Sequence, residues 1–162
     1  MHFKKSNDNQ STILHEGSVP YLTFKKLDQA GVRHGFSTRM GGVSEGMFSM
    51  LNLSYNRGDK KEAVDENFRR ISEAIGFDHT KLVFSNQIHE TRIHKVTKED
   101  CGKVMKDMDG LATNEQGIPL YTGYADCVPL FFYDPVEKAV ALAHSGWRGT
   151  VGRIGAKMVQ FL

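Results

Sequence analysis

The clearest periodic pattern along the chain predicts a helix over residues 62–75. Its apolar positions recur at spacings of 4, 3 and 4, so they share one helical face. The residues on this face are Val64, Phe68, Ile71 and Ile75. Gly76 follows directly, and glycine commonly ends a helix.

Short apolar runs bounded by turn residues predict strands elsewhere. Residues 11–36 are expected to hold two short strands around a turn or a short helix. Further strands are predicted at 82–84, 92–96, 110–113, 118–124, 128–133 and 139–143. The segment 133–138, Tyr-Asp-Pro-Val-Glu-Lys, has turn chemistry, so the last two strands are predicted to form a hairpin.

The last apolar pattern predicts one amphipathic helix from near Gly149 to the end of the sequence. Its apolar residues, spaced 3, 4 and 4 apart, are Val151, Ile154, Met158 and Leu162. No glycine cap, proline or polar tail follows, so we expect a C-terminally incomplete domain. The predicted organisation is a polar, flexible leader at 1–20 and a single domain at 21–162.

Composition and charge narrow the class of protein. The 162 residues include 40% hydrophobic and 25% charged residues, which suits one soluble globular domain. A formal net charge of +2 is too small to indicate nucleic acid or an anionic membrane as the main partner. No apolar run approaches the roughly 18 residues of a membrane span, and the N-terminus has no hydrophobic signal core. Two cysteines make no disulfide framework, so a reduced, cytoplasmic setting is expected.

Three soft metal ligands stand in distinct segments. His89 closes Ser-Asn-Gln-Ile-His, Cys127 closes Tyr-Ala-Asp-Cys, and His144 lies within Ala-His-Ser-Gly-Trp-Arg-Gly. All three lie at predicted strand ends, where rigid elements can hold a ligand in place. Two imidazoles and one thiolate leave a fourth zinc position open, which is typical of a catalytic zinc site. If these side chains converge, the sequence predicts a zinc enzyme.

Each candidate also has a simpler interpretation. His89 could be a surface histidine and Cys127 a small buried hydrophobe, and spacings of 38 and 17 residues match no zinc finger. Asp126 could orient a ligand, or it could be a cap or turn residue. Asp109 could simply make a turn, and Cys101 is expected to be an incidental loop thiol. The histidines assigned no role in a site are His34, His79 and His94.

A glycine-rich loop and two arginines suggest an anion site. In the segment 39–46, the tandem Gly41 and Gly42 can adopt positive φ and let the backbone approach a ligand. Arg39 and Arg148 lie in glycine-containing loops, where a guanidinium could clamp phosphate or a carboxylate. A surface salt bridge is the alternative for both.

Taken together, these residues resemble the YfiH/YlmD family, also labelled laccase-domain or multicopper polyphenol oxidase proteins. The matching segments are, in family order, His-Gly-Phe-Ser-Thr-Arg (34–39), Gly-Gly-Val-Ser (41–44), Leu-Asn-Leu (51–53), Gln-Ile-His (87–89), Asp-Gly-Leu-Ala-Thr (109–113), Ala-Asp-Cys-Val-Pro (125–129) and Ala-His-Ser-Gly-Trp-Arg-Gly (143–149). So many ordered matches are highly specific. Two departures accompany them: family members usually continue well beyond the last predicted helix, and Tyr-Thr-Gly-Tyr at 121–124 stands where a more aliphatic strand is expected.

The resemblance implies an α/β fold, an α+β sandwich with mixed β-sheets flanked by helices, in a YfiH-like catalytic domain. It implies Zn²⁺ bound by His89, Cys127 and His144. It also implies purine nucleoside phosphorylase activity, in which adenosine, inosine or methylthioadenosine reacts with phosphate to give the base and ribose 1-phosphate. Adenosine deamination to inosine is implied as a second activity. Purine nucleoside and phosphate are therefore the expected partners. The guanidinium of Arg39 and its glycine-rich loop, and not the resemblance, make Arg39 the residue expected to hold phosphate.

Three other functions are open at this stage. The family label suggests copper-dependent phenol oxidation, but laccase chemistry needs several copper ions and His-x-His pairs, and the sequence has no such pair. Cys127 could instead be a nucleophile activated by His144 or His89, which would give a metal-free hydrolase. An inactive relative acting as a binding module is the third.

Overall fold

The structure, a computed structural model, describes residues 11–162, which divide after Gly76 into two compact units. We call residues 11–76 the N-terminal unit and residues 77–162 the C-terminal unit. The single domain expected over residues 21–162 stays a prediction. No helix of the described residues is long and apolar enough to cross a membrane.

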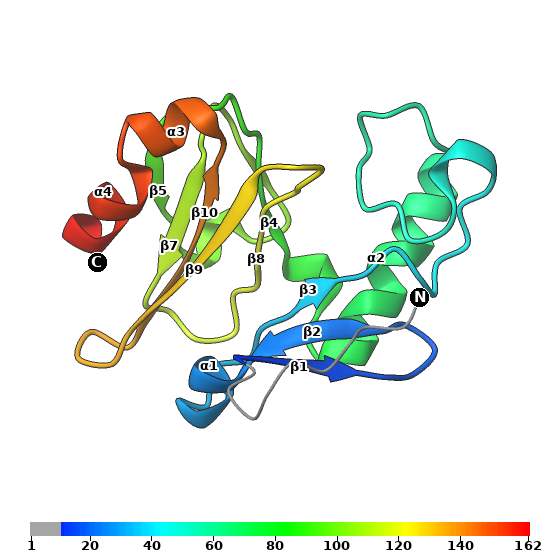
Figure 1. Ribbon diagram of the computed structural model, residues 1–162, viewed down its shortest axis with the longest axis horizontal. Coiled ribbons are helices and arrows are strands. Elements are labelled where there is room, and N and C mark those ends of the chain that lie inside the picture. Colours follow the sequence, from blue (N-terminus) through cyan, green and yellow to red (C-terminus); the bar gives the residue numbers. More distant parts are fainter. Residues whose placement is uncertain (1–10) are drawn as a thin grey trace. The chain divides into compact units, whose positions relative to one another are not determined.

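The N-terminal unit contains one small antiparallel sheet and one long helix (Figure 1). Its elements are β1 (Thr12–His15), β2 (Tyr21–Phe24), α1 (Lys25–Gln29), β3 (Phe36–Ser37), the 3-10 turn η1 (Gly46–Phe48) and α2 (Lys61–Ile75). The predicted pair of strands near a short helix is therefore present. Strand β1 falls within the stretch predicted to be a leader, whose residues 1–10 lie outside the described part of the chain.

Helix α2 confirms the strongest periodic prediction. It buries Val64, Phe68 and Ile71, and Ile71 packs with Val19 and other apolar residues in the core of this unit. Gly76 ends the helix in the left-handed region at φ 89°, and its N–H donates to a carbonyl of the last turn at 2.7 Å. The glycine is required because a side chain is strained at this φ.

The buried face of α2 also holds the glycine-rich loop. The Asn67 side chain is fully buried, and its Oδ1 accepts the Val43 N–H at 2.8 Å. Its Nδ2 donates to Ser44 Oγ and to the Asn52 carbonyl, both at 2.8 Å. A Cβ at Gly42 would collide with the backbone at Met50 and Leu51. The close backbone approach expected of the glycine pair is thus made to the chain's own loop.

The C-terminal unit contains two sheets flanked by helices. Its elements are η2 (His79–Lys81), β4 (Val83–Ser85), β5 (Ile93–Lys95), η3 (Lys98–Asp100), β6 (Val104–Met105), β7 (Gly110–Thr113), β8 (Leu120–Tyr121), β9 (Val128–Asp134), β10 (Ala139–Ser145), α3 (Trp147–Val151) and α4 (Ile154–Phe161). A mixed sheet has the order β5-β7-β10-β9, and a parallel sheet has the order β6-β4-β8. The β9–β10 hairpin and the α/β class with mixed sheets flanked by helices are confirmed.

The prediction of one continuous C-terminal helix is wrong. The chain turns at Arg153, which has φ 61°, and this turn separates α3 from α4. Ile154 and Met158 are fully buried against the mixed sheet, whereas Val151 is 77% exposed. The break explains the difference, because the spacing from residue 151 to 154 keeps both residues on one face only in an unbroken helix.

Asn67→Ala is expected to lower the free energy of unfolding by about 2 kcal/mol, because the Val43 N–H and the Asn52 carbonyl lose their partner. Urea unfolding would measure this change. Asn56→Ala, at an exposed loop position, is the control and should change little. An unchanged unfolding free energy in Asn67→Ala would show that other contacts hold the loop.

Candidate metal centre

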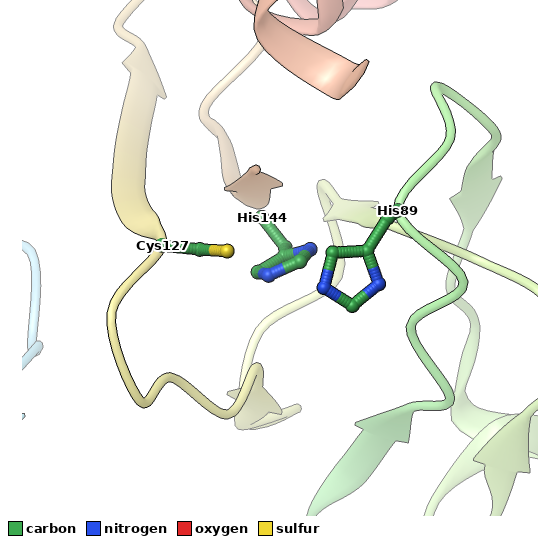
Figure 2. A group of neighbouring side chains, drawn as sticks. All are labelled: His89, Cys127 and His144. Atoms are coloured by element: carbon green, nitrogen blue, oxygen red, sulfur yellow. The ribbon is translucent and has the colours of Figure 1, made fainter. Parts of the chain in front are cut away.

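The structure brings together the three ligands singled out in the sequence. The ligand atoms of His89, Cys127 and His144 all lie within 4.8 Å of one another. Figure 2 shows the three side chains converging from three separate backbone segments. The rings of the two histidines meet nearly edge to face, at 4.8 Å between centroids and 86° between planes.

The mixed sheet explains how residues far apart in sequence converge. In the antiparallel β9–β10 hairpin, His144 pairs with Pro129, so the end of β10 lies beside the start of β9, directly after Cys127. On the other side of β10, Ala143 pairs with Gly110 at the start of β7. The residue before that glycine is Asp109, which therefore also lies beside His144.

The Asp109 carboxylate orients His144. Asp109 is fully buried, and its Oδ1 lies 2.9 Å from Nδ1 of His144, which is 3% exposed. Burial alone raises the pKa of Asp109, but the hydrogen bonds from His144 and from three backbone N–H groups outweigh it and lower the pKa. The ionised carboxylate can only accept, so Nδ1 of His144 donates and Nε2 keeps its lone pair for a metal ion.

The same carboxylate holds the backbone that carries His89. Its Oδ1 accepts the His89 N–H at 2.9 Å, and its Oδ2 accepts those of Ile88 and Glu90 at 3.2 and 2.9 Å. His89 has φ 64°, a left-handed conformation in which histidine is more common than most residues. The exposed His89 ring thus projects from a tightly held turn.

Gly146 leaves the space that the three ligands share. A Cβ at this position would lie 3.1 Å from His89 Cδ2, 3.2 Å from Cys127 Sγ and 3.6 Å from His144 Cε1. Any larger residue would press on all three side chains at once. The glycine before α3 is therefore part of the geometry of the site.

Cys127 is half-buried, and two carboxylates, those of Asp126 and Asp109, act on its thiol. Its thiol donates to Asp126 Oδ1 across 3.6 Å. Burial raises the pKa of the Cys127 thiol, and the carboxylates of Asp126 and Asp109 raise it further. Asp126 thus interacts with the thiol, which is one of the two roles that the sequence allowed.

Tyr124 forms a wall beside His144. Its ring centroid lies 5.7 Å from that of His144, and its hydroxyl donates to the Ala143 carbonyl at 3.3 Å and hydrogen-bonds Thr122 at 2.7 Å. Burial raises the pKa of Tyr124 to about 12, so the phenol stays protonated at neutral pH. The unusual segment 121–124 therefore places a hydrogen-bonded aromatic residue beside His144.

The remaining candidates lie outside this cluster or are not placed relative to it. Arg39 belongs to the N-terminal unit, where its guanidinium donates to the Ser49 carbonyl. Arg148 is exposed on α3 and lies 5.3 Å from the centroid of the Trp147 ring. Cys101 was expected to be an incidental loop thiol, but it packs against an apolar core cluster of the C-terminal unit.

Sequence reasoning underestimated Asp109, which it interpreted as a turn residue. The structure makes it the buried partner of His144 and of three backbone N–H groups. The Asp-Gly-Leu-Ala-Thr segment was among the matching segments, but no local pattern distinguishes a buried acceptor from a turn-forming aspartate. Gln87 was also given no role of its own.

The chemistry of the donors fits a metal ion. Imidazole nitrogens and thiolate sulfurs are both zinc ligands, and three protein ligands leave the fourth position that a catalytic zinc keeps for water or substrate. A carboxylate or carbonyl group that accepts from the other ring nitrogen usually orients a metal-binding histidine, and Asp109 does so for His144. The cluster therefore has both the ligands and the support that a metal centre needs.

Comparison with known proteins places the chain in a family. Residues 33–162 match the family model described as multi-copper polyphenol oxidoreductase laccase. "Purine nucleoside phosphorylase YlmD" of Bacillus subtilis (strain 168) is 44% identical over 133 residues, which are 78% of this chain and 48% of that protein. The chain spans about half the length of the curated relatives it matches.

Solved structures agree with this placement. The crystal structure of YlmD from Geobacillus stearothermophilus aligns with a TM-score of 0.86 at 37% identity, over 92% of this chain and 58% of that one. The Bacillus licheniformis hypothetical protein YfiH aligns with a TM-score of 0.82 at 38% identity, over 86% and 54% of the two chains. The resemblance carried by the ordered motifs is thus confirmed, and the chain belongs to the laccase-domain family that includes YfiH and YlmD.

Proposed function

We propose that the chain carries the metal centre of a zinc-dependent purine nucleoside phosphorylase that also deaminates adenosine. The observation that carries this proposal is the convergence of His89, Cys127 and His144 on one shared space. The names of the relatives, purine nucleoside phosphorylases, support the reaction class. The substrates would be a purine nucleoside and phosphate, and the products the free base and ribose 1-phosphate.

Zinc is favoured over copper by the donor set. A laccase needs several copper ions, whereas the described residues contain one three-ligand group with no further histidine in it. Two imidazoles and a thiolate also suit copper of the electron-transfer type, which needs a weak axial ligand such as methionine. Copper is therefore the alternative metal.

Each residue of the metal centre has a separate role. Asp109 fixes His144 in one tautomer and holds the His89 turn, so the ligands are positioned before anything binds. When bound, zinc would supply Lewis-acid chemistry at the substrate. Tyr124 covers one side of His144.

Arg39, in the N-terminal unit, would bind phosphate through its guanidinium, because its glycine-rich loop and its charge suit an anion.

Purified protein is expected to contain about one zinc per chain and to release adenine from adenosine only when phosphate is present. His89→Ala is the sharpest variant, because the exposed side chain can be removed with little effect on folding. It should lose zinc and adenine release together, and so should a chelated sample until zinc is restored. Metal analysis and chromatography of the released base would measure both. Full turnover in a metal-free sample would sink the proposal.

Asp109→Asn is expected to weaken zinc binding by about 10- to 100-fold, because the partner of His144 loses its charge and part of its acceptor capacity. Competition with a chromophoric chelator would measure the change. Asp107→Asn is the matched control, at an exposed position two residues away, and should bind zinc as the parent does. Parent-like affinity in Asp109→Asn would remove Asp109 from the metal centre.

Arg39→Gln is expected to raise KM for phosphate by about 10- to 100-fold, the range of one charge-assisted hydrogen bond, with a smaller effect on KM for the nucleoside. Steady-state kinetics at varied phosphate would test this. Arg57→Gln, at an exposed loop position of the same unit, is the control. Unchanged phosphate kinetics would contradict the assignment of Arg39.

A metal-free Cys-His hydrolase is the second candidate, and one observation favours it. Asp109 bonded to His144 has the form of an orienting carboxylate in a nucleophile–histidine–carboxylate triad, with Cys127 nearby as nucleophile. The second imidazole, His89, has no role in such a triad but completes a metal site. The zinc content of the purified protein therefore separates the two functions.

A further inference from the structure

We propose that Gln87 is a positioning residue that holds Cys127 within reach of the two histidines. The inference rests on the proposed metal role of the site. It concerns the one ligand that Asp109 does not hold by a hydrogen bond, since the bonds of that carboxylate go to His144 and to the backbone at 88–90.

Both polar atoms of the Gln87 carboxamide bind the backbone of one residue, Gly123, on the segment that leads to Cys127. Nε2 of Gln87 donates to the Gly123 carbonyl at 2.7 Å. The Gly123 N–H donates back to Oε1 of Gln87 at 2.9 Å. Because donor and acceptor are both engaged, the carboxamide has one orientation and fixes the distance between the two segments.

The pair of hydrogen bonds between Gln87 and Gly123, which we call the Gln87 clamp, lies where the strand pairing of β4 and β8 ends. Strands β4 and β8 are parallel, and their last pair is Phe84 with Tyr121. Beyond that pair, residues 122–127 form no strand before β9 begins. The Gln87 side chain therefore replaces the backbone ladder at the point where the chain leaves β8 and turns toward Cys127.

The positions of the two partners link the clamp to the ligands. Gln87 is two residues before His89, and Gly123 is four residues before Cys127. The clamp thus joins the segments of two ligands directly, whereas the Tyr124 hydroxyl ties the same segment to β10 through the Ala143 carbonyl. That second tie leaves the segment attached when Gln87 is replaced, so the change should act on the placement of Cys127 more than on folding.

Cobalt(II) loaded in place of zinc reports on the thiolate ligand separately from the two imidazoles. A cobalt–thiolate bond gives a near-ultraviolet charge-transfer band that requires Cys127, and its visible bands report the coordination number. Gln87→Met keeps the length of the side chain and removes both hydrogen bonds. It is expected to bind cobalt about 10- to 100-fold more weakly and to lose most of the charge-transfer band, as Cys127→Ser does. The thermal midpoint of the metal-free protein should stay near that of the parent.

Two controls make the result specific. Gln116→Met makes the same change at an exposed position of the same unit and should leave band and affinity unchanged. Gln87→Glu keeps the acceptor for the Gly123 N–H but turns an oxygen toward the Gly123 carbonyl, so it breaks the other hydrogen bond and serves as a second variant if Gln87→Met does not fold. It should show the same loss of the thiolate band.

The outcomes separate this inference from the proposed function. If the parent shows the thiolate band and a folded Gln87 variant shows the same band and the same affinity, the role of Gln87 is overturned and the proposed metal centre is not. A lower thermal midpoint with an intact band also overturns it, because Gln87 would then serve folding only. A folded parent that binds neither zinc nor cobalt overturns the proposed metal centre and this inference together.

Discussion

The buried carboxylate of Asp109 is the interaction on which the candidate site depends. It accepts hydrogen bonds from the Nδ1 of His144 and from three successive backbone N–H groups, so it sets a side chain and a turn at the same time. The ionised carboxylate of Asp109 only accepts hydrogen bonds and is fully buried, so breaking any of these bonds would leave a buried group without its partner and cost free energy. Two candidate metal ligands from separate segments, His89 and His144, are thereby positioned by the same carboxylate.

The mixed sheet provides the frame for that carboxylate. Strand β10 lies between β7 and β9, so its end at His144 has the start of β7 on one side and the start of β9 on the other. The residues immediately before those two starts are Asp109 and Cys127. An antiparallel arrangement of three neighbouring strands thus converts distant positions in sequence into one cluster, and Gly146 leaves the room that the cluster needs.

Local patterns predicted the parts of this structure that local forces determine. Helix α2, strand β7 and the β9–β10 hairpin followed from apolar periodicity and turn residues, and the three ligands followed from their motif context. The break at Arg153 was not predicted, because a non-glycine residue with positive φ has no distinct sequence pattern. The role of Asp109 was missed for a different reason: its partner His144 is 35 residues away, and only the strand pairing brings them together.

The charge of Asp109 also explains why a cation suits this place. Its side-chain partner among the described residues is the His144 imidazole, and its other donors are neutral amides. A desolvated anion balanced by neutral donors gains from any positive charge nearby. His144 would hold a metal ion through Nε2 while its Nδ1 donates to the carboxylate, so the imidazole would connect the anion to the cation. The residue that shapes the cluster would thus also strengthen metal binding, so one buried charge links the fold to the chemistry of the site.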